Sequence, residues 1–149
     1  MCGGSFSLEN LMIQLANIHS ERLNDAQRLA VTADLFGVHF PFRLEPTIYG
    51  MADRLAPAYD GGYWHFYSLS NGGWYMAPAT DAIFDVSCEN GFEGSMSADA
   101  FGITACLYAY SNLAFDQGPF AQVCAEHYHL LREFAVEHAE ARAILQATD

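Results

Sequence analysis

Asp60 and His65 are the residues whose types and spacing come nearest to a catalytic pair. A carboxylate beside an imidazole can act as a general acid–base couple, for example in hydrolysis. His65, however, lies in the aromatic run 63–67, where a strand would place Trp64 and Phe66 on one face and His65 on the other. Such alternation is typical of a packed sheet and favours a structural role for His65. A hydrolase that uses Asp60 and His65 is therefore only an alternative hypothesis.

The other histidines and the cysteines do not form the pattern of a metal site. On a helix, His127 and His129 would point roughly 160° apart, so they cannot share a metal ion. Cys124 could meet His127 three residues later, but no further ligands stand near them in the sequence. The cysteines are scattered singly, which favours free thiols in a reducing compartment over a disulfide framework. They are Cys2, Cys88, Cys106 and Cys124.

Two glycine pairs could suggest a phosphate-binding loop. Neither the pair 61–62 nor the pair 72–73 has the GxxxxGK[ST] or GxGxxG spacing, and the chain contains no lysine for a P-loop. No GxSxG nucleophile motif is present either. The glycine pairs therefore predict turns, and we expect no catalytic residue, no cofactor and no small-molecule substrate.

Helical spacing of apolar residues marks both ends of the chain. Leu8, Leu11, Leu15 and Ile18, and then Leu29, Ala33 and Phe36, predict two helices between residues 8 and 36. Asn24 or Asp25 is suited to cap the second of them, and Gly37 to end it. Further helices are predicted over 46–55, over 97–115 with Ser97 as the cap, from Pro119 to about 134, and as a short turn over 139–145. The helix over 97–115 is apolar nearly all round, which predicts a central position.

The middle of the chain has the period of two that is typical of strands. Residues 63–69 and 74–77 predict one hairpin around Asn71-Gly72-Gly73, and residues 82–88 and 92–96 predict a second around Asn90-Gly91. Strands in the middle with helices on both sides favour an α+β class. We expect a single two-layer domain over 1–149, in which a meander of about four short antiparallel strands packs against helices from both ends.

The charge balance limits the possible partners. The formal net charge of −12 comes from 18 acidic residues against six arginines, so the chain lacks the basic patch that direct nucleic-acid binding requires. The protein carries on the order of one net negative charge per 600 Å² of surface, whereas duplex DNA carries roughly one per 100 Å². The surface charge is therefore too dilute to imitate DNA over the whole protein. No apolar run is long enough to span a membrane, and no signal peptide is recognisable, so we expect a cytoplasmic protein.

Three neighbouring segments carry a specific resemblance: IYGMADRL at 48–55, YDGGYWHFY at 59–67 and LSNGGWYMAP at 69–78. In these segments the chain resembles the ArdB/KlcA antirestriction family. The similarity continues at 97–103 and in the C-terminal helix, and it is weakest over residues 1–26. The resemblance implies a non-enzymatic α+β protein that relieves host type I restriction of incoming plasmid or phage DNA.

The resemblance also implies partners among the host proteins of the restriction or DNA-processing machinery. The family supplies no catalytic residues, so the signature either contacts a partner or only builds the fold. The candidate contact residues are Tyr59, Asp60, Gly61, Gly62, Tyr63, Trp64, Asn71, Gly72, Gly73, Trp74 and Tyr75. Besides the hydrolase, the alternative is an acidic mimic of DNA that inhibits the restriction complex directly.

Overall fold

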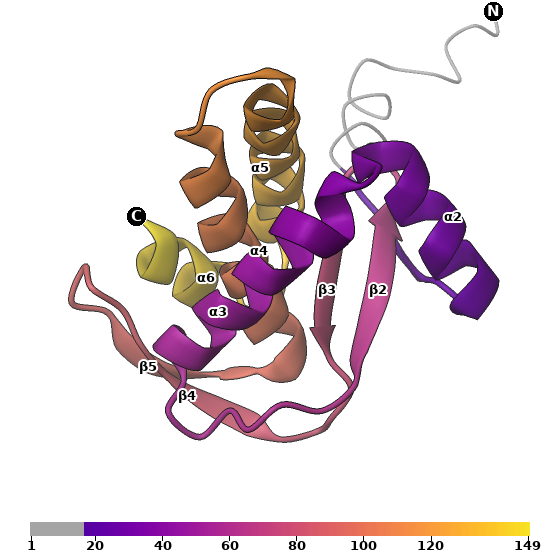
Figure 1. Cartoon of the computed structure of the whole chain (residues 1–149). Coiled ribbons are helices and arrows are strands. Elements are labelled where there is room, and N and C mark those ends of the chain that lie inside the picture. Colours follow the sequence, from indigo (N-terminus) through magenta and orange to yellow (C-terminus); the bar gives the residue numbers. More distant parts are fainter. Residues whose placement is uncertain (1–16) are drawn as a thin grey trace, which may run out of the picture.

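The computed structural model describes residues 17–149 and confirms the α+β class (Figure 1). The strands of the described chain are β1 (Ser20–Arg22), β2 (Trp64–Leu69), β3 (Trp74–Pro78), β4 (Ile83–Ser87) and β5 (Glu93–Ser97). Its helices are α2 (Asp25–Phe36), α3 (Glu45–Leu55), α4 (Ala98–Ala114), α5 (Pro119–Glu137) and α6 (Ala141–Thr148), with a π-helical segment η2 (Phe40–Leu44) before α3. None of these helices is long and apolar enough to cross a membrane.

Helix α2 begins and ends as its sequence predicts. The Asn24 side chain accepts a hydrogen bond from the Gln27 backbone N–H, and the Gln27 side chain accepts one from the Asn24 backbone N–H. This capping box satisfies two backbone donors that a helix start otherwise leaves free. Gly37 ends the helix at a φ of 58°, a conformation that favours glycine.

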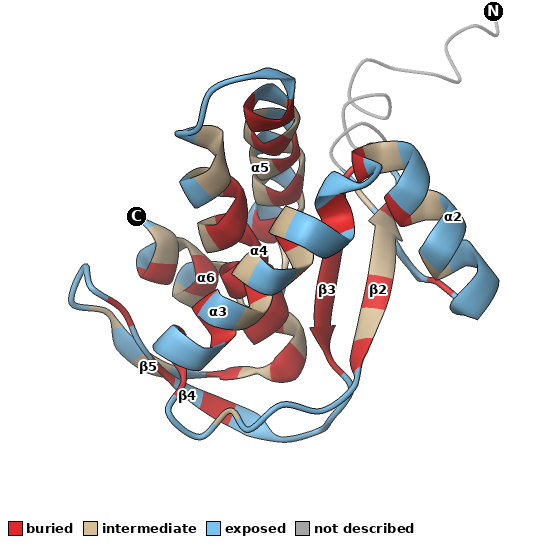
Figure 2. Ribbon diagram, in the orientation of Figure 1, coloured by how far each residue is buried: buried red, intermediate tan, exposed pale blue. Residues whose placement is uncertain are grey.

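Helix α4 occupies the centre of the molecule, as its apolar sequence predicts. It contacts β3 and the helices α3, α5 and α6, and Figure 2 shows it buried along most of its length. A Cβ added at Gly102 would lie 2.4 Å from the Ala77 Cβ and 2.4 Å from the Met76 carbonyl oxygen. The absence of a side chain at Gly102 therefore lets α4 lie directly against the backbone of β3.

The expected four-strand meander is instead two small sheets. β2 and β3 form the predicted hairpin, and β4 and β5 form the second one, but β3 and β4 do not pair. The Ala79 N–H still donates to the Tyr63 carbonyl oxygen, which extends the β2–β3 pairing by one residue, and β4 begins only at Ile83. β4 packs on α4 instead, where the Phe84 ring stacks on Phe101 with the ring centroids 4.5 Å apart.

One strand of the described chain was not predicted. Residues 20–22, between the two helices expected from Leu8 to Phe36, form β1, an exposed edge strand that pairs antiparallel with β2. β1 has no alternating apolar pattern, so the sequence carries no signal for this strand. The helix expected to begin at Leu8 lies almost wholly outside the described residues. The π-helical segment η2 had no recognisable signal.

An aromatic core joins the sheet to the helices. The Trp74 ring lies within 5.1–5.6 Å, centroid to centroid, of three phenylalanine rings, all in edge-to-face arrangements. Those rings belong to Phe36 of α2, Phe40 of η2 and Phe66 of β2. Edge-to-face aromatic pairs add stability beyond their buried area, so this cluster fixes how α2 and η2 sit on the hairpin.

Candidate functional site

The signature residues lie at opposite ends of the β2–β3 hairpin. Residues 59–63 precede β2, whereas residues 71–73 connect β2 to β3 (Figure 1). A strand of six residues spans roughly 20 Å, so the two groups form separate clusters on the molecule. The structure therefore divides the candidate contact residues into a loop before β2 and a turn after it.

The loop before β2 is anchored at its two ends and exposed between them. The Trp64 indole N–H donates to the Tyr59 hydroxyl over 3.0 Å, which ties the start of the loop to a buried ring. Asp60, Gly61, Gly62 and Tyr63 are exposed, and Tyr63 keeps 58% of its accessible surface. Gly61 and Gly62 have φ angles of 97° and 106°, so the double glycine gives the loop a backbone path that other residues rarely adopt.

Arg28 of α2 holds the far end of this loop. It donates from Nη1 to the Trp64 carbonyl oxygen over 2.7 Å, and its guanidinium carbon lies 3.6 Å from the centroid of the Phe66 ring. The same carbon lies 4.9 Å from the centroid of the exposed Tyr63 ring. At an exposed ring such a cation–π contact is worth about 0.5–1 kcal/mol, so Arg28 favours this position of the Tyr63 ring.

The turn after β2 is fastened to α5. The Asn71 amide donates to the Leu130 carbonyl oxygen over 2.9 Å, and its side-chain oxygen accepts from the Gly73 N–H. A Cβ at Gly73 would lie 3.1 Å from the Leu130 Cβ, closer than nearly all real Cβ contacts. Gly72, at a φ of 93°, makes the turn itself. These contacts give residues 71–73 a structural role.

Three of the five aromatic residues in the candidate set are buried. Trp64, Trp74 and Tyr75 expose at most 1% of their surface, so a partner could not reach their rings without unfolding the hairpin. The Trp74 indole N–H has no hydrogen-bond partner among the described residues. Trp64 and Trp74 face the same side of the sheet, as alternation predicts, but Tyr75 on the other side is buried as well.

A polar network around Tyr75 had no clear sequence signal. The Tyr75 hydroxyl donates to Asp99 over 2.7 Å, and the Asp99 carboxylate also faces His138 Nε2 at 2.8 Å. The Glu140 N–H donates to His138 Nδ1, so that nitrogen carries no proton and Nε2–H donates to Asp99. Burial acts to raise the pKa of Asp99, but the hydrogen bonds from His138 and Tyr75 lower it overall. The network connects β3 to the chain between α5 and α6.

The structure does not bring Asp60 and His65 together. Within residues 17–149 no hydrogen bond or ion pair joins them. The pKa of His65 is lowered by burial and then by the positive charges of Arg22 and Arg28, the opposite of what a carboxylate neighbour would do. The hydrolase alternative therefore lacks its acid–base pair.

The cysteines and histidines of the described chain do not converge on a metal. No group of three or more His, Cys, Asp or Glu side chains between residues 17 and 149 could hold an ion. Cys88, Cys106 and Cys124 are free and buried. His127 is buried between the Phe36 and Tyr110 rings, and burial lowers its pKa to about 4. His127 is thus a neutral core residue.

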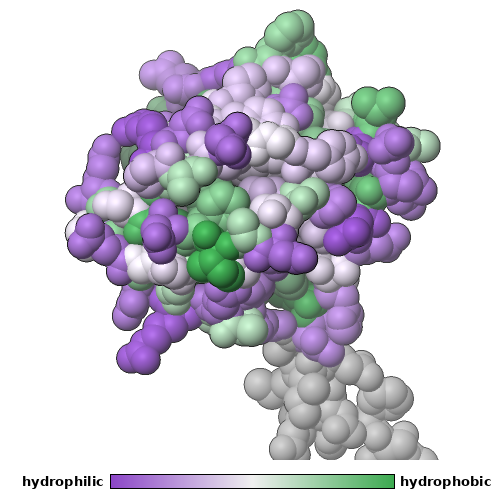
Figure 3. Space-filling view, turned by 90° about the horizontal axis from the view of Figure 1, so that it is seen from below, coloured by the Kyte–Doolittle hydropathy of each residue, from purple (hydrophilic) through white to green (hydrophobic). Residues whose placement is uncertain are grey.

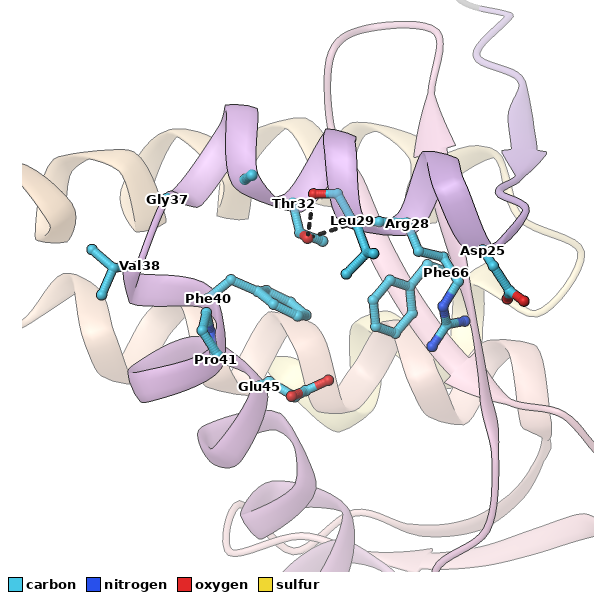
Figure 4. Close-up of a pocket in the computed structure, with 11 residues that line it drawn as sticks. Asp25, Arg28, Leu29, Thr32, Gly37, Val38, Phe40, Pro41, Glu45 and Phe66 are labelled. Atoms are coloured by element: carbon cyan, nitrogen blue, oxygen red, sulfur yellow. Dashed lines mark hydrogen bonds between the residues drawn. The ribbon is translucent and has the colours of Figure 1, made fainter.

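The surface around the loop is mostly polar. Figure 3 views the molecule from the side on which this loop lies and shows hydrophilic residues over most of the face, with smaller apolar patches between them. A groove of about 650 Å³ lies between α2 and η2, and Arg28 and Phe66 are among its lining residues (Figure 4). Arg28 thus contacts both the exposed loop and this groove.

The comparisons with known proteins agree with one another. The family model described as antirestriction protein matches residues 57–149. Antirestriction protein KlcA of Escherichia coli is 44% identical over 137 residues, which cover 89% of this chain and 94% of that protein. The uncharacterised protein YafX of Escherichia coli strain K12 is 42% identical over 132 residues, which cover 84% of each chain.

A solved structure shares the fold. It comes from work on the KlcA and ArdB proteins, which describes a novel fold and antirestriction activity against type I DNA restriction systems in vivo but not in vitro. It superposes with a TM-score of 0.82 at 40% identity and covers 89% of this chain and 95% of that one. On the family match, the shared sequence and the shared fold, the chain belongs to the antirestriction protein family.

Proposed function

We propose that this chain relieves type I restriction of incoming DNA in cells, without catalysis, by binding a host protein. The observation that carries the proposal is the similarity to the KlcA and ArdB structure, whose proteins act against type I systems in vivo but not in vitro. Activity that needs the cell fits a route through a further cellular protein better than direct occupation of the enzyme's DNA site.

The chemistry of the described residues supports a binding role. No metal cluster is found among residues 17–149, and the one Asp–His contact, between Asp99 and His138, is a partly buried structural link. Of the six arginines in the sequence, three form ion pairs with acidic side chains. This leaves little positive charge with which to neutralise DNA phosphates, so we place the target among proteins.

The loop at residues 59–63 is the proposed contact surface. Its exposed members combine an aromatic ring, a carboxylate and two glycines that bring the backbone to the surface, and Arg28 holds the Tyr63 ring in place. Exposed, pre-positioned aromatic side chains are frequent anchors of protein interfaces. We leave the turn at 71–73 out of this surface because Asn71 and Gly73 contact α5 and only Gly72 is exposed.

The test compares restriction of unmodified phage in cells with an active type I system, with and without this gene. We expect phage plating to rise when the gene is expressed, while plating of already modified phage stays unchanged. Equal restriction with and without the gene would contradict the proposal.

A second assay separates the proposal from DNA mimicry. A mimic would compete with duplex DNA for the purified restriction complex, with a strong dependence on salt. We expect the purified complex to cleave DNA normally in excess of this protein. Inhibition that disappears at high salt would favour mimicry instead.

A further inference from the structure

Within residues 17–149, the groove between α2 and η2 is an open apolar site. Its volume is about 650 Å³, and its walls include Leu29 and Val38 beside the core rings Phe40 and Phe66 (Figure 4). Leu29 keeps 76% of its accessible surface and Val38 keeps 60%, so water covers both side chains in the free protein. Figure 4 shows the Leu29 side chain reaching from α2 toward the groove. Burying these side chains would be favourable.

Negative charge lines the rim of this groove. Asp25 and Glu45 both belong to it, and Glu45 is partly removed from water. The one cation in the lining, Arg28, already donates to the Trp64 carbonyl oxygen and covers the Phe66 ring. Glu45 already interacts with Arg28 and with the Tyr49 hydroxyl. The groove thus offers an apolar floor with two carboxylates, of which Asp25 is the one left for an incoming cation. The net charge of −12 on the whole chain would steer a basic partner toward it.

We propose that the groove between α2 and η2 binds an amphipathic segment of a protein partner whose apolar side chains are flanked by lysine or arginine. A helix laid between two helical walls, with apolar anchors spaced three and four residues apart, fits the shape of such a groove. This inference rests on the proposed function for the identity of the partner, which would be the host protein bound in cells.

Charge distinguishes this occupant from the chain's own N-terminal segment. Residues 1–16 contain apolar side chains at Leu8, Leu11 and Leu15, but no lysine or arginine and one acid, Glu9. That segment would add an acid to a rim that is already acidic. A basic partner is therefore the better complement.

The groove and the exposed loop form one continuous surface. Arg28 lies beside the Tyr63 ring of the loop and the Phe66 ring of the groove. A partner that inserts a segment into the groove can therefore reach the loop at 59–63 at the same time. The groove supplies apolar anchorage, and the loop supplies polar contacts beside it.

A peptide titration of the full chain tests the proposal. The probe is a short helical peptide with leucines three and four residues apart and lysines between them, and the control replaces the lysines with glutamates. We expect the lysine peptide to shift the backbone NMR signals of residues 28–45 and the glutamate peptide to leave them in place. Leu29→Ser should weaken binding about tenfold, as losing a central apolar anchor does, and Val136→Ser on α5 should not.

Three results of the titration would overturn the proposal. Equal affinity for both peptides would contradict the preference for a basic partner. Unchanged affinity of Leu29→Ser for the lysine peptide would show that the peptide does not bind in the groove. If neither peptide binds, the groove is not a site for such a segment. Leu29 and Val136 are both exposed helical residues, at 76% and 51%, so both variants should fold and differ only in their place on the surface.

Two measurements on the free protein address the other occupants. A spin label on Cys2 would broaden the signals of residues 28–45 if the N-terminal segment filled the groove. Shifts of the same signals on dilution would reveal a second copy there. Either result would contradict a basic partner, and we expect neither.

Restriction relief separates this inference from the proposed function. If the parent relieves restriction and Leu29→Ser relieves it equally, the groove is not the partner site, although the proposed function stands. If the parent gives no relief, the proposed function fails, and the peptide titration still decides what the groove binds. We expect Leu29→Ser to reduce restriction relief at least about tenfold and Val136→Ser to leave it unchanged.

Discussion

The two glycine-rich ends of the β2–β3 hairpin look alike in sequence and differ in structure. Both contain a glycine pair beside aromatic residues and at least one glycine with a positive φ. At the end before β2, nothing lies within 4 Å of a Cβ built on Gly61 or Gly62. At the end after β2, Asn71 is bonded to α5 and Gly73 lies against Leu130. A shared motif can therefore build the fold at one end and leave a surface open at the other.

Among changes at the two ends of the hairpin, Gly73→Val should cause the largest loss of stability. The added Cβ would lie 3.0 Å from the Leu69 Cδ1 and 3.1 Å from the Leu130 Cβ, and the valine methyls would reach further into α5. We expect a loss of about 3 kcal/mol in the free energy of unfolding, the upper range for overpacking a core. Urea unfolding followed by circular dichroism measures it. A variant as stable as the parent would show that the turn is not packed on α5.

Acid should destabilise the fold through α5, the helix to which the turn is fastened. His127, one helical turn before Leu130, is buried between aromatic rings, which lowers its pKa from 6.5 to about 4. The unfolded chain therefore binds a proton that the folded chain rejects, so stability falls as the pH drops from about 6.5 to about 4, by about 2–3 kcal/mol in all. His127→Phe should flatten the stability–pH curve over that window. An unchanged curve would mean that other groups cause the acid sensitivity.

Asn71→Ala should lower the free energy of unfolding by less than Gly73→Val does. The change removes the bond to the Leu130 carbonyl and the bond from the Gly73 N–H. Two lost hydrogen bonds at a partly buried site correspond to about 1–2 kcal/mol. Thermal unfolding measures this loss, and restriction relief should fall only as far as the folded fraction falls. If Asn71→Ala stays folded but no longer relieves restriction, the turn is a contact site.

Replacing Gly72 and Gly62 by valine should have similar and smaller effects. Both have a positive φ, at 93° and 106°, and a Cβ at either position meets nothing within 4 Å. Backbone strain alone then costs about 1–2 kcal/mol at each. Parallel urea unfolding of the two variants tests this equality. A much larger loss at Gly72 would mean that the turn also depends on packing that the open space there does not reveal.

Local signals predicted most of the elements. The capping residues Asn24 and Ser97, the glycine after α2 and the Asn-Gly turns all act on the backbone within a few residues, so the sequence shows them directly. β1 and the split into two sheets depend on contacts between distant segments, such as Ser20 with Leu69 and Phe84 with Phe101. Periodicity carries no information on such contacts.

The candidate site could be predicted only in part. The motif residues were found from the sequence, but their separation into a turn fastened to α5 and an open loop depends on where α5 packs. The contact between Asp99 and His138 joins residues far apart in the chain, and only the first-turn position of Asp99 had a local reason. The groove beside Arg28 likewise exists only once α2 and η2 are placed side by side.

The central claim is that the loop before β2 contacts a partner and that the turn after it does not. The most direct measurement combines Asp60→Asn with Tyr63→Ser and determines restriction relief and unfolding free energy in the same variant. Both side chains are exposed, and the change removes only the contact between Tyr63 and Arg28, so we expect stability within about 1 kcal/mol of the parent and a loss of relief of at least about tenfold. A stable variant that relieves restriction as well as the parent would contradict the claim.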